Sequence, residues 1–141
     1  MRTALAYYSV TGHSKKIGGA VANALQIPIY NLKTDTIPEP LDCLFVVGGI
    51  YGGKSDAHML NQLSHLDGGA VRQAILISSS ASGFGRQDQV RALLQSRGIQ
   101  VLSDEYVCMG NFLIVRLGHP NQAEVDGAVR FARQALARMN A

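Results

Sequence analysis

The chain has 141 residues, a formal net charge of +3, 47% hydrophobic residues and 16% charged residues. This length fits a single domain over residues 1–141 with its own hydrophobic core, and no apolar run approaches the ~20 residues of a membrane span. The basic residues are spread along the chain, which argues against nucleic acid as a partner. Because no signal-peptide pattern precedes the first predicted strand, we expect a cytoplasmic protein, and we expect it to be a monomer.

The first half of the chain alternates strand and helix patterns. The apolar residues 2–8 predict a strand, and the hydrophobic spacing over 14–25 predicts an amphipathic helix. Residues 27–32 predict a second strand, which Pro28 places at a sheet edge. After a loop rich in proline, the continuous apolar run 43–47 is typical of a central strand that is buried on both faces.

The second half continues the alternation. Helical spacing at 59–66 is followed by a predicted strand at 71–77, a helix around 90–94 and a strand at 99–109. Asn121 is a candidate N-cap, and the hydrophobic spacing after it predicts a last helix ending near residue 139. This order predicts an α/β fold: a three-layer α/β/α sandwich with a five-stranded parallel sheet of order 2-1-3-4-5.

The loop between the first strand and the first helix has the composition of a phosphate site. The N-terminus of a helix presents backbone N–H groups and a positive dipole end, and both favour an anion. The loop adds three hydroxyl side chains, and a glycine permits a tight turn next to the ligand. The candidate phosphate-binding residues are Ser9, Val10, Thr11, Gly12, His13 and Ser14.

Two further loops follow the third and fourth predicted strands. The loop at 48–55 carries four glycines and Tyr51, and the loop at 78–85 carries hydroxyls, glycines and Phe84. In a parallel sheet of this order, ligands bind at the carboxyl ends of strands one and three, where the strand order reverses. An anion site flanked by two loops with aromatic residues suits a flat, phosphorylated heterocycle.

The hexapeptide 9–14 resembles the flavodoxin phosphate loop, Ser/Thr-x-Ser/Thr-Gly-x-Ser/Thr, and the strand count, loop positions and length resemble a short-chain flavodoxin over the whole chain. The resemblance implies that the six residues of the first loop bind the phosphate of flavin mononucleotide (FMN). It also implies an electron-transfer protein that shuttles electrons between redox partner proteins. By the same resemblance, the isoalloxazine ring is bound by Gly49, Ile50, Tyr51, Gly52 and Gly53 and by Ser80, Ala81, Ser82, Gly83, Phe84 and Gly85.

The sequence departs from the family in two respects. His13 stands where a small or amide residue is commoner, and the usual acidic balance of flavodoxins is absent. Because positive potential stabilises an anionic reduced flavin, we expect a less negative reduction potential than in an acidic flavodoxin.

Other functions remain open. Residues Gly48–Ser55 also match the P-loop pattern G-x-x-x-x-G-K-S/T after a strand and before a helix, although no predicted strand ends in an aspartate for magnesium. A flavodoxin-like domain that docks a partner without flavin is a second alternative. No nucleophile, acid–base pair or metal-ligand cluster stands out, so we predict no catalytic or metal-binding residues. This favours an electron carrier over an NAD(P)H- or quinone-linked flavin enzyme.

The two cysteines, Cys43 and Cys108, lie in apolar segments with strand patterns. We expect both to be buried, reduced thiols, with a regulatory disulfide as the alternative.

Overall fold

In the computed structural model, the described residues are 2–10, 12–50, 54–80, 86–109 and 122–139. They alternate strands and helices in the predicted order. The elements are β1 (Thr3–Tyr8), α1 (His13–Leu25), β2 (Ile29–Asn31), β3 (Leu41–Ile50), α2 (Ala57–Leu63), β4 (Val71–Ser80), α3 (Asp88–Ser96), β5 (Gln100–Met109) and α4 (Gln122–Met139).

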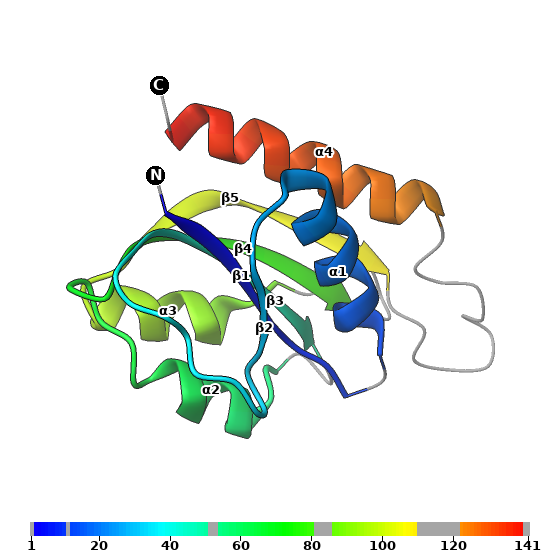
Figure 1. Cartoon of the computed structure of the whole chain (residues 1–141). Coiled ribbons are helices and arrows are strands. Elements are labelled where there is room, and N and C mark those ends of the chain that lie inside the picture. The colour runs from blue at the N-terminus through cyan, green and yellow to red at the C-terminus, as the bar shows by residue number, and fades with distance from the viewer. Residues whose placement is uncertain (1, 11, 51–53, 81–85, 110–121, 140–141) are drawn as a thin grey trace.

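The strands form one five-stranded sheet of order β2-β1-β3-β4-β5, and every pair is parallel. Helices α1 and α4 cover one face, and α2 and α3 cover the other (Figure 1). The predicted three-layer architecture and strand order are therefore confirmed, including the edge position of β2. Since all strands run in one direction, their carboxyl ends meet at a single edge, and the segments after β1, β3 and β4 start there.

Alternation along the central strands divides the core into two clusters. In β3, Leu44 and Val46 face α2 and α3, whereas Phe45 and Val47 face α1 and α4. All four side chains are fully buried. Burying an apolar side chain of this size contributes about 1.5–3 kcal/mol relative to exposure, so a strand that is apolar at every position is stable only between two helical layers.

Several predicted boundaries are wrong. The second strand is restricted to Ile29–Asn31, and β3 and β4 continue beyond residues 47 and 77. Gly49 and Ile50, predicted as loop residues, are buried in β3, and Ser80 is the last residue of β4. The sheet overrides the local glycine and serine signals because the β3–β4 pairing extends without interruption to the pair Ile50–Ser80.

Gly48 lies inside β3 for a steric reason. A Cβ atom at this position would lie 2.5 Å from Met59 Cε and 2.9 Å from Gln87 Oε1. The carboxyl end of β3 is therefore packed directly against α2 and the start of α3. The glycine here is a requirement of close packing and is not the sign of a turn.

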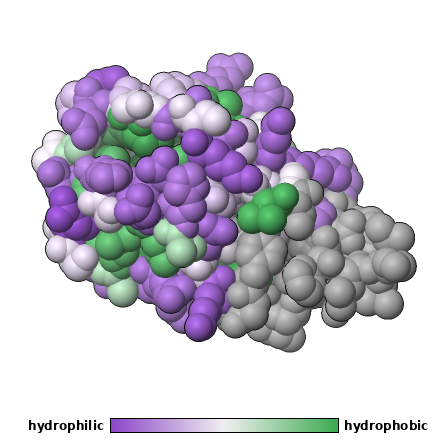
Figure 2. Space-filling view, turned by 90° about the horizontal axis from the view of Figure 1, so that it is seen from below, coloured by the Kyte–Doolittle hydropathy of each residue, from purple (hydrophilic) through white to green (hydrophobic). Residues whose placement is uncertain are grey.

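The surface on the side of α2 and α3 is mainly hydrophilic, and its apolar patches are separated by polar side chains (Figure 2). The exposed large hydrophobic side chains among the described residues are Val10, 57% exposed, and Ile29, 40% exposed. None of the described helices combines the length and apolarity that crossing a bilayer requires.

Candidate functional site

The N-terminus of α1 is open to an anion. Its N-cap is Gly12, which has a left-handed φ of 93° and gives no side-chain cap, and its first turn contains no acidic residue. The first hydrogen bond of the helix runs from Lys16 N to Gly12 O, at 3.1 Å. The N–H groups of the first turn therefore have no acceptor within the helix, and the positive end of the helix dipole points out of the carboxyl edge of the sheet.

Ser14 carries the most informative polar atom of this site. Its side chain is 2% exposed, and its Oγ atom has no hydrogen-bond partner among the described residues. Leaving a buried hydroxyl unsatisfied costs about 1–3 kcal/mol, so such groups are uncommon in folded proteins. A phosphate oxygen at the start of α1 would supply the missing acceptor. The residues present therefore fit the phosphate group that the sequence predicts.

Ser9 and Gly12 close the turn that leads into α1. The backbone N–H of Gly12 donates to Ser9 Oγ at 2.8 Å, which leaves the hydroxyl hydrogen of Ser9 free to donate to a ligand. A Cβ added to Gly12 would have no neighbour within 4 Å, so the glycine is required by its backbone conformation. Because Val10 is exposed, it could contribute to a phosphate site only through its backbone.

His13 is half-buried in the first turn of α1. Burial, and to a smaller degree the nearby Lys16, lowers the pKa of the imidazole below its ordinary value of 6.5. The neutral imidazole is therefore the dominant form at neutral pH. In this form, one ring nitrogen can donate a hydrogen bond and the other can accept one.

The other helices carry carboxylates where α1 has none. Asp56 is the N-cap of α2, and its Oδ1 accepts hydrogen bonds from His58 N and Met59 N at 2.8 and 3.3 Å. Asp88 and Glu124 lie in the first turns of α3 and α4. The P-loop alternative needs a phosphate at the N-terminus of α2, where the Asp56 carboxylate already occupies the N–H groups. The described part of that segment therefore argues against it.

A tyrosine and a histidine that the sequence reasoning did not select lie beside the site. Tyr8 ends β1, and its hydroxyl is 3.0 Å from Nδ1 of His58 at the start of α2. Lys33 Nζ lies 5.2 Å from the centre of the Tyr8 ring. Burial, and then the Asp56 carboxylate, raises the pKa of Tyr8. The only sequence signal was the position of Tyr8 at the end of a strand, immediately before the hydroxyl-rich loop.

The predicted ring-binding segments are described only in part. Gly49 and Ile50 lie in β3, and they are paired with Ser79 and Ser80 of β4, so the structure brings the two segments together at one edge. The predicted site residues outside the described part of the chain are Thr11, Tyr51, Gly52, Gly53, Ala81, Ser82, Gly83, Phe84 and Gly85.

Glu105 is a second group that sequence reasoning missed. It lies in β5, its side chain is fully buried, and it pairs with Arg86 and Arg91. The available signal was an acidic residue in a predicted strand, directly before its apolar end, Tyr106 to Met109. Charged side chains are seldom fully buried unless they are paired.

Away from the carboxyl edge of the sheet, the described part of the chain includes a cavity and a buried thiol. A cavity of about 560 Å³ lies at the opposite, amino end of the sheet, where Arg2, Gln26, Tyr30 and Pro38 are among its lining residues. Among the described residues, no group of three or more His, Cys, Asp or Glu side chains is arranged to hold a metal ion. Cys43 is a buried free thiol, as expected.

Comparison with known proteins is informative at the level of structure. The sequence matches no protein-family model and no curated protein. Oxidised flavodoxin 1 from Bacillus cereus is 14% identical with a TM-score of 0.73, and the match covers 97% of this chain and 98% of that one. Fusobacterium nucleatum flavodoxin bound to flavin mononucleotide is 15% identical with a TM-score of 0.71, and the match covers 98% of this chain and 99% of that one.

The same fold occurs within a larger protein, the rubredoxin oxygen:oxidoreductase from Desulfovibrio gigas. That match has 13% identity and a TM-score of 0.69, and it covers 99% of this chain and 37% of the larger one. The topology and these matches together show that the chain has the flavodoxin-like fold.

Proposed function

We propose that this protein binds FMN and acts as an electron carrier between redox partner proteins. The observation that carries the proposal is the N-terminus of α1, which lacks a carboxylate and holds the buried, unpartnered Ser14 hydroxyl. It lies beside the carboxyl ends of β1 and β3, the point where the strand order reverses. Ligands of doubly wound sheets bind at this point.

The phosphate of FMN would be held by Ser9 and Ser14 and by backbone N–H groups of the first turn of α1. The flavin supplies the electron transfer, and the protein binds and orients it and adjusts its potential. The ring would lie toward the segments that follow β3 and β4, whose strand ends are paired through Ile50 and Ser80.

The charges at this edge bear on the potential. Among the described residues that begin α1, α2 and α3 or pair with Glu105, five cations (Lys15, Lys16, Lys54, Arg86 and Arg91) stand against three carboxylates (Asp56, Asp88 and Glu105), a balance of +2. A positive surrounding favours the added negative charge of a reduced flavin. We therefore expect a less negative potential than in an acidic flavodoxin, and a redox titration of the holoprotein tests it. Because exposed charges are screened, the difference should shrink as the salt concentration rises.

The deciding experiment is reconstitution. Purified protein should show flavin absorbance near ~450 nm, lose it when the cofactor is stripped, and regain it with FMN in a one-to-one titration. Riboflavin, which lacks the phosphate, should bind more weakly. An apoprotein that leaves FMN fluorescence and absorbance unchanged would refute the proposal and leave a partner-docking domain as the better reading.

The P-loop alternative is tested with the same preparation. Magnesium-dependent ATP hydrolysis that is lost in Lys54→Ala would support it. We expect none, because Asp56 caps the helix that would have to bind the phosphate.

A further inference from the structure

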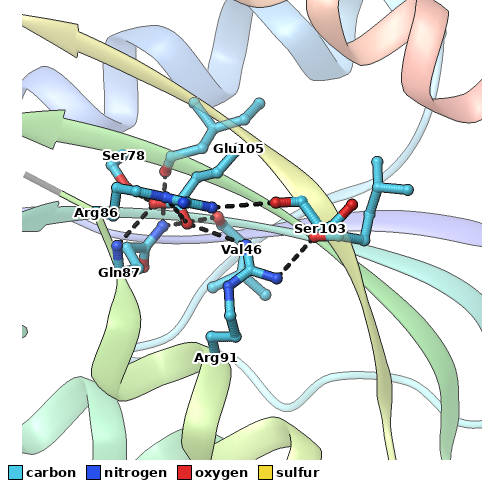
Figure 3. Close-up of polar contacts among 9 residues, drawn as sticks. Val46, Ser78, Arg86, Gln87, Arg91, Ser103 and Glu105 are labelled. Atoms are coloured by element: carbon cyan, nitrogen blue, oxygen red, sulfur yellow. Dashed lines mark hydrogen bonds and ion pairs between the residues drawn. The ribbon is translucent and has the colours of Figure 1, made fainter.

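We propose that Glu105 is a positioning residue for the flavin-ring end of the site. This inference rests on the proposed function. The buried carboxylate joins the carboxyl end of β4, the start of α3 and a bulge in β5 (Figure 3).

The contacts of Glu105 satisfy both of its oxygens. Oε2 accepts hydrogen bonds from the Ser78 hydroxyl and from Gln87 N, the latter at 2.7 Å. Oε1 lies 3.2 Å from Arg91 Nη2 and 3.6 Å from Arg86 Nε. Ser78 lies in β4 just before the segment 81–85, and Arg86 and Gln87 follow that segment directly. One carboxylate therefore links the carboxyl end of β4 to the residues at the start of α3.

The two arginines also donate hydrogen bonds to backbone carbonyls of β5, which explains why two cations lie here beside a buried negative charge. The β4–β5 register shifts between the pairs Ala74–Val101 and Leu76–Glu105, so β5 carries two extra residues there. Such a bulge frees backbone carbonyls from the ladder. Arg91 Nη1 donates to Leu102 O at 2.8 Å, and Arg86 Nη2 donates to Ser103 O at 3.0 Å. Glu105 offsets one of the two positive charges that these guanidinium groups bring here.

Gln87 extends the arrangement to β3. Its side chain is fully buried, and its Nε2 donates to Ile77 O at 2.8 Å and to Val46 O at 3.3 Å. The residue that Glu105 holds by its backbone therefore also ties together the carboxyl halves of β3 and β4. Both strands lead into the segments proposed to hold the flavin ring, whereas α1 takes no part in these contacts. The cluster should therefore affect the ring end of the ligand and not its phosphate end.

The test compares three probes on the apoprotein: FMN, riboflavin and inorganic phosphate. Glu105→Gln preserves the side-chain shape, but its amide NH₂ must face either the N–H of Gln87 or the two guanidinium groups. We expect the Kd values for riboflavin and FMN to rise at least tenfold, whereas the Kd for phosphate stays within twofold of wild type. The absorption spectrum and potential of the bound flavin should also change. If Glu105 had a merely structural role, Glu105→Gln would weaken the binding of all three probes together or of none.

Asp104→Asn is the matched control. It removes the same charge from the neighbouring residue, whose side chain is 52% exposed and whose carboxylate pairs with Arg138 at 2.6 Å. It should bind all three probes as wild type does. If Glu105→Gln does not fold, Ser78→Ala is the deciding variant, because it leaves every charge in place and removes only the hydrogen bond between Ser78 and the Glu105 carboxylate. It should weaken riboflavin binding at least threefold.

The outcomes separate the two proposals. A wild-type apoprotein that binds neither flavin overturns the proposed function and this inference with it. A wild-type protein that binds FMN, with Ser78→Ala and any folded Glu105→Gln protein binding riboflavin equally well, overturns the inference alone.

Discussion

Replacing Ser14 with alanine should stabilise the ligand-free protein and weaken its binding of FMN. In the ligand-free chain, the Ser14 hydroxyl is buried without a partner, so its removal relieves a desolvation cost. In the complex, the same hydroxyl would donate to a phosphate oxygen, so its removal deletes a charge-assisted hydrogen bond. The two effects have opposite signs, which a purely structural serine would not produce.

The magnitudes are large enough to measure. An unsatisfied buried hydroxyl costs about 1–3 kcal/mol, and a domain of this size gains roughly 4 °C in Tm for each kcal/mol. We expect the Tm of the ligand-free variant to rise by roughly 4 to 12 °C on this basis. A hydrogen bond to a charged group is worth about 1.5–3 kcal/mol, so the Kd for FMN should rise by about 10- to 100-fold.

The assay measures the stability of the ligand-free protein and its Kd for FMN on one preparation. Urea or thermal unfolding of the stripped protein gives the stability, and quenching of flavin fluorescence gives the Kd. Ser96→Ala is the matched control, since the Ser96 hydroxyl is exposed on α3 and donates to Leu93 O at 2.6 Å. It should change stability by less than about 0.5 kcal/mol and leave the affinity unchanged. A Ser14→Ala protein that is less stable without ligand, or that binds FMN like wild type, would refute the reasoning.

Three further predictions concern single residues. Gly48→Ala should lower the free energy of unfolding by about 1–3 kcal/mol, because the new Cβ would lie 2.5 Å from Met59 Cε; an unchanged urea midpoint would contradict it. Burial raises the pKa of Cys43 to about 12, so its thiol should resist a disulfide reagent at pH 8 in the folded protein and react in urea, as peptide mapping would show. Burial lowers the pKa of His13 in the folded protein, so the imidazole takes up a proton more readily in the unfolded chain. The free energy of unfolding should therefore fall as the pH drops from the ordinary pKa of 6.5 through the lowered pKa of the folded state. His13→Gln should lose less stability between pH 7 and pH 5 than wild type; equal losses would rule this out.

The sequence predicted the fold well because each central strand is apolar at nearly every position. A run such as 43–47 is stable only between two helical layers, and alternating helices provide both layers by right-handed crossovers. The ends of the strands were harder to predict. Gly48 and Ser80 carry turn-forming residue types, yet each extends a strand whose neighbour continues beside it. Pairing between distant segments decides such boundaries, and a local window does not contain that information.

For the candidate site, the sequence identified the first loop but not the buried polar groups behind it. Ser9, Gly12 and Ser14 were predicted from the composition of a strand–loop–helix junction, and the structure places them at an open helix N-terminus. Glu105 and Gln87 were missed because their roles depend on contacts between β4, β5 and α3. The sequence does not show which distant groups a polar residue such as Glu105 or Gln87 will contact, so the burial of both residues could be seen only in the structure.

Unpartnered buried polar atoms lie at one edge of the sheet. Among the described residues, they are Ser14 Oγ, Ser55 Oγ and Gln87 Oε1, and these residues lie at the starts of α1, α2 and α3. Stability alone would favour apolar side chains or satisfied hydrogen bonds at such positions. At α2, the Asp56 cap already repels an anion, whereas at α1 no carboxylate competes for the N–H groups. Among the described helix starts, the unsatisfied hydroxyl and the missing carboxylate therefore coincide only at α1. This coincidence is why we propose that a phosphate binds at the first loop and not at the second.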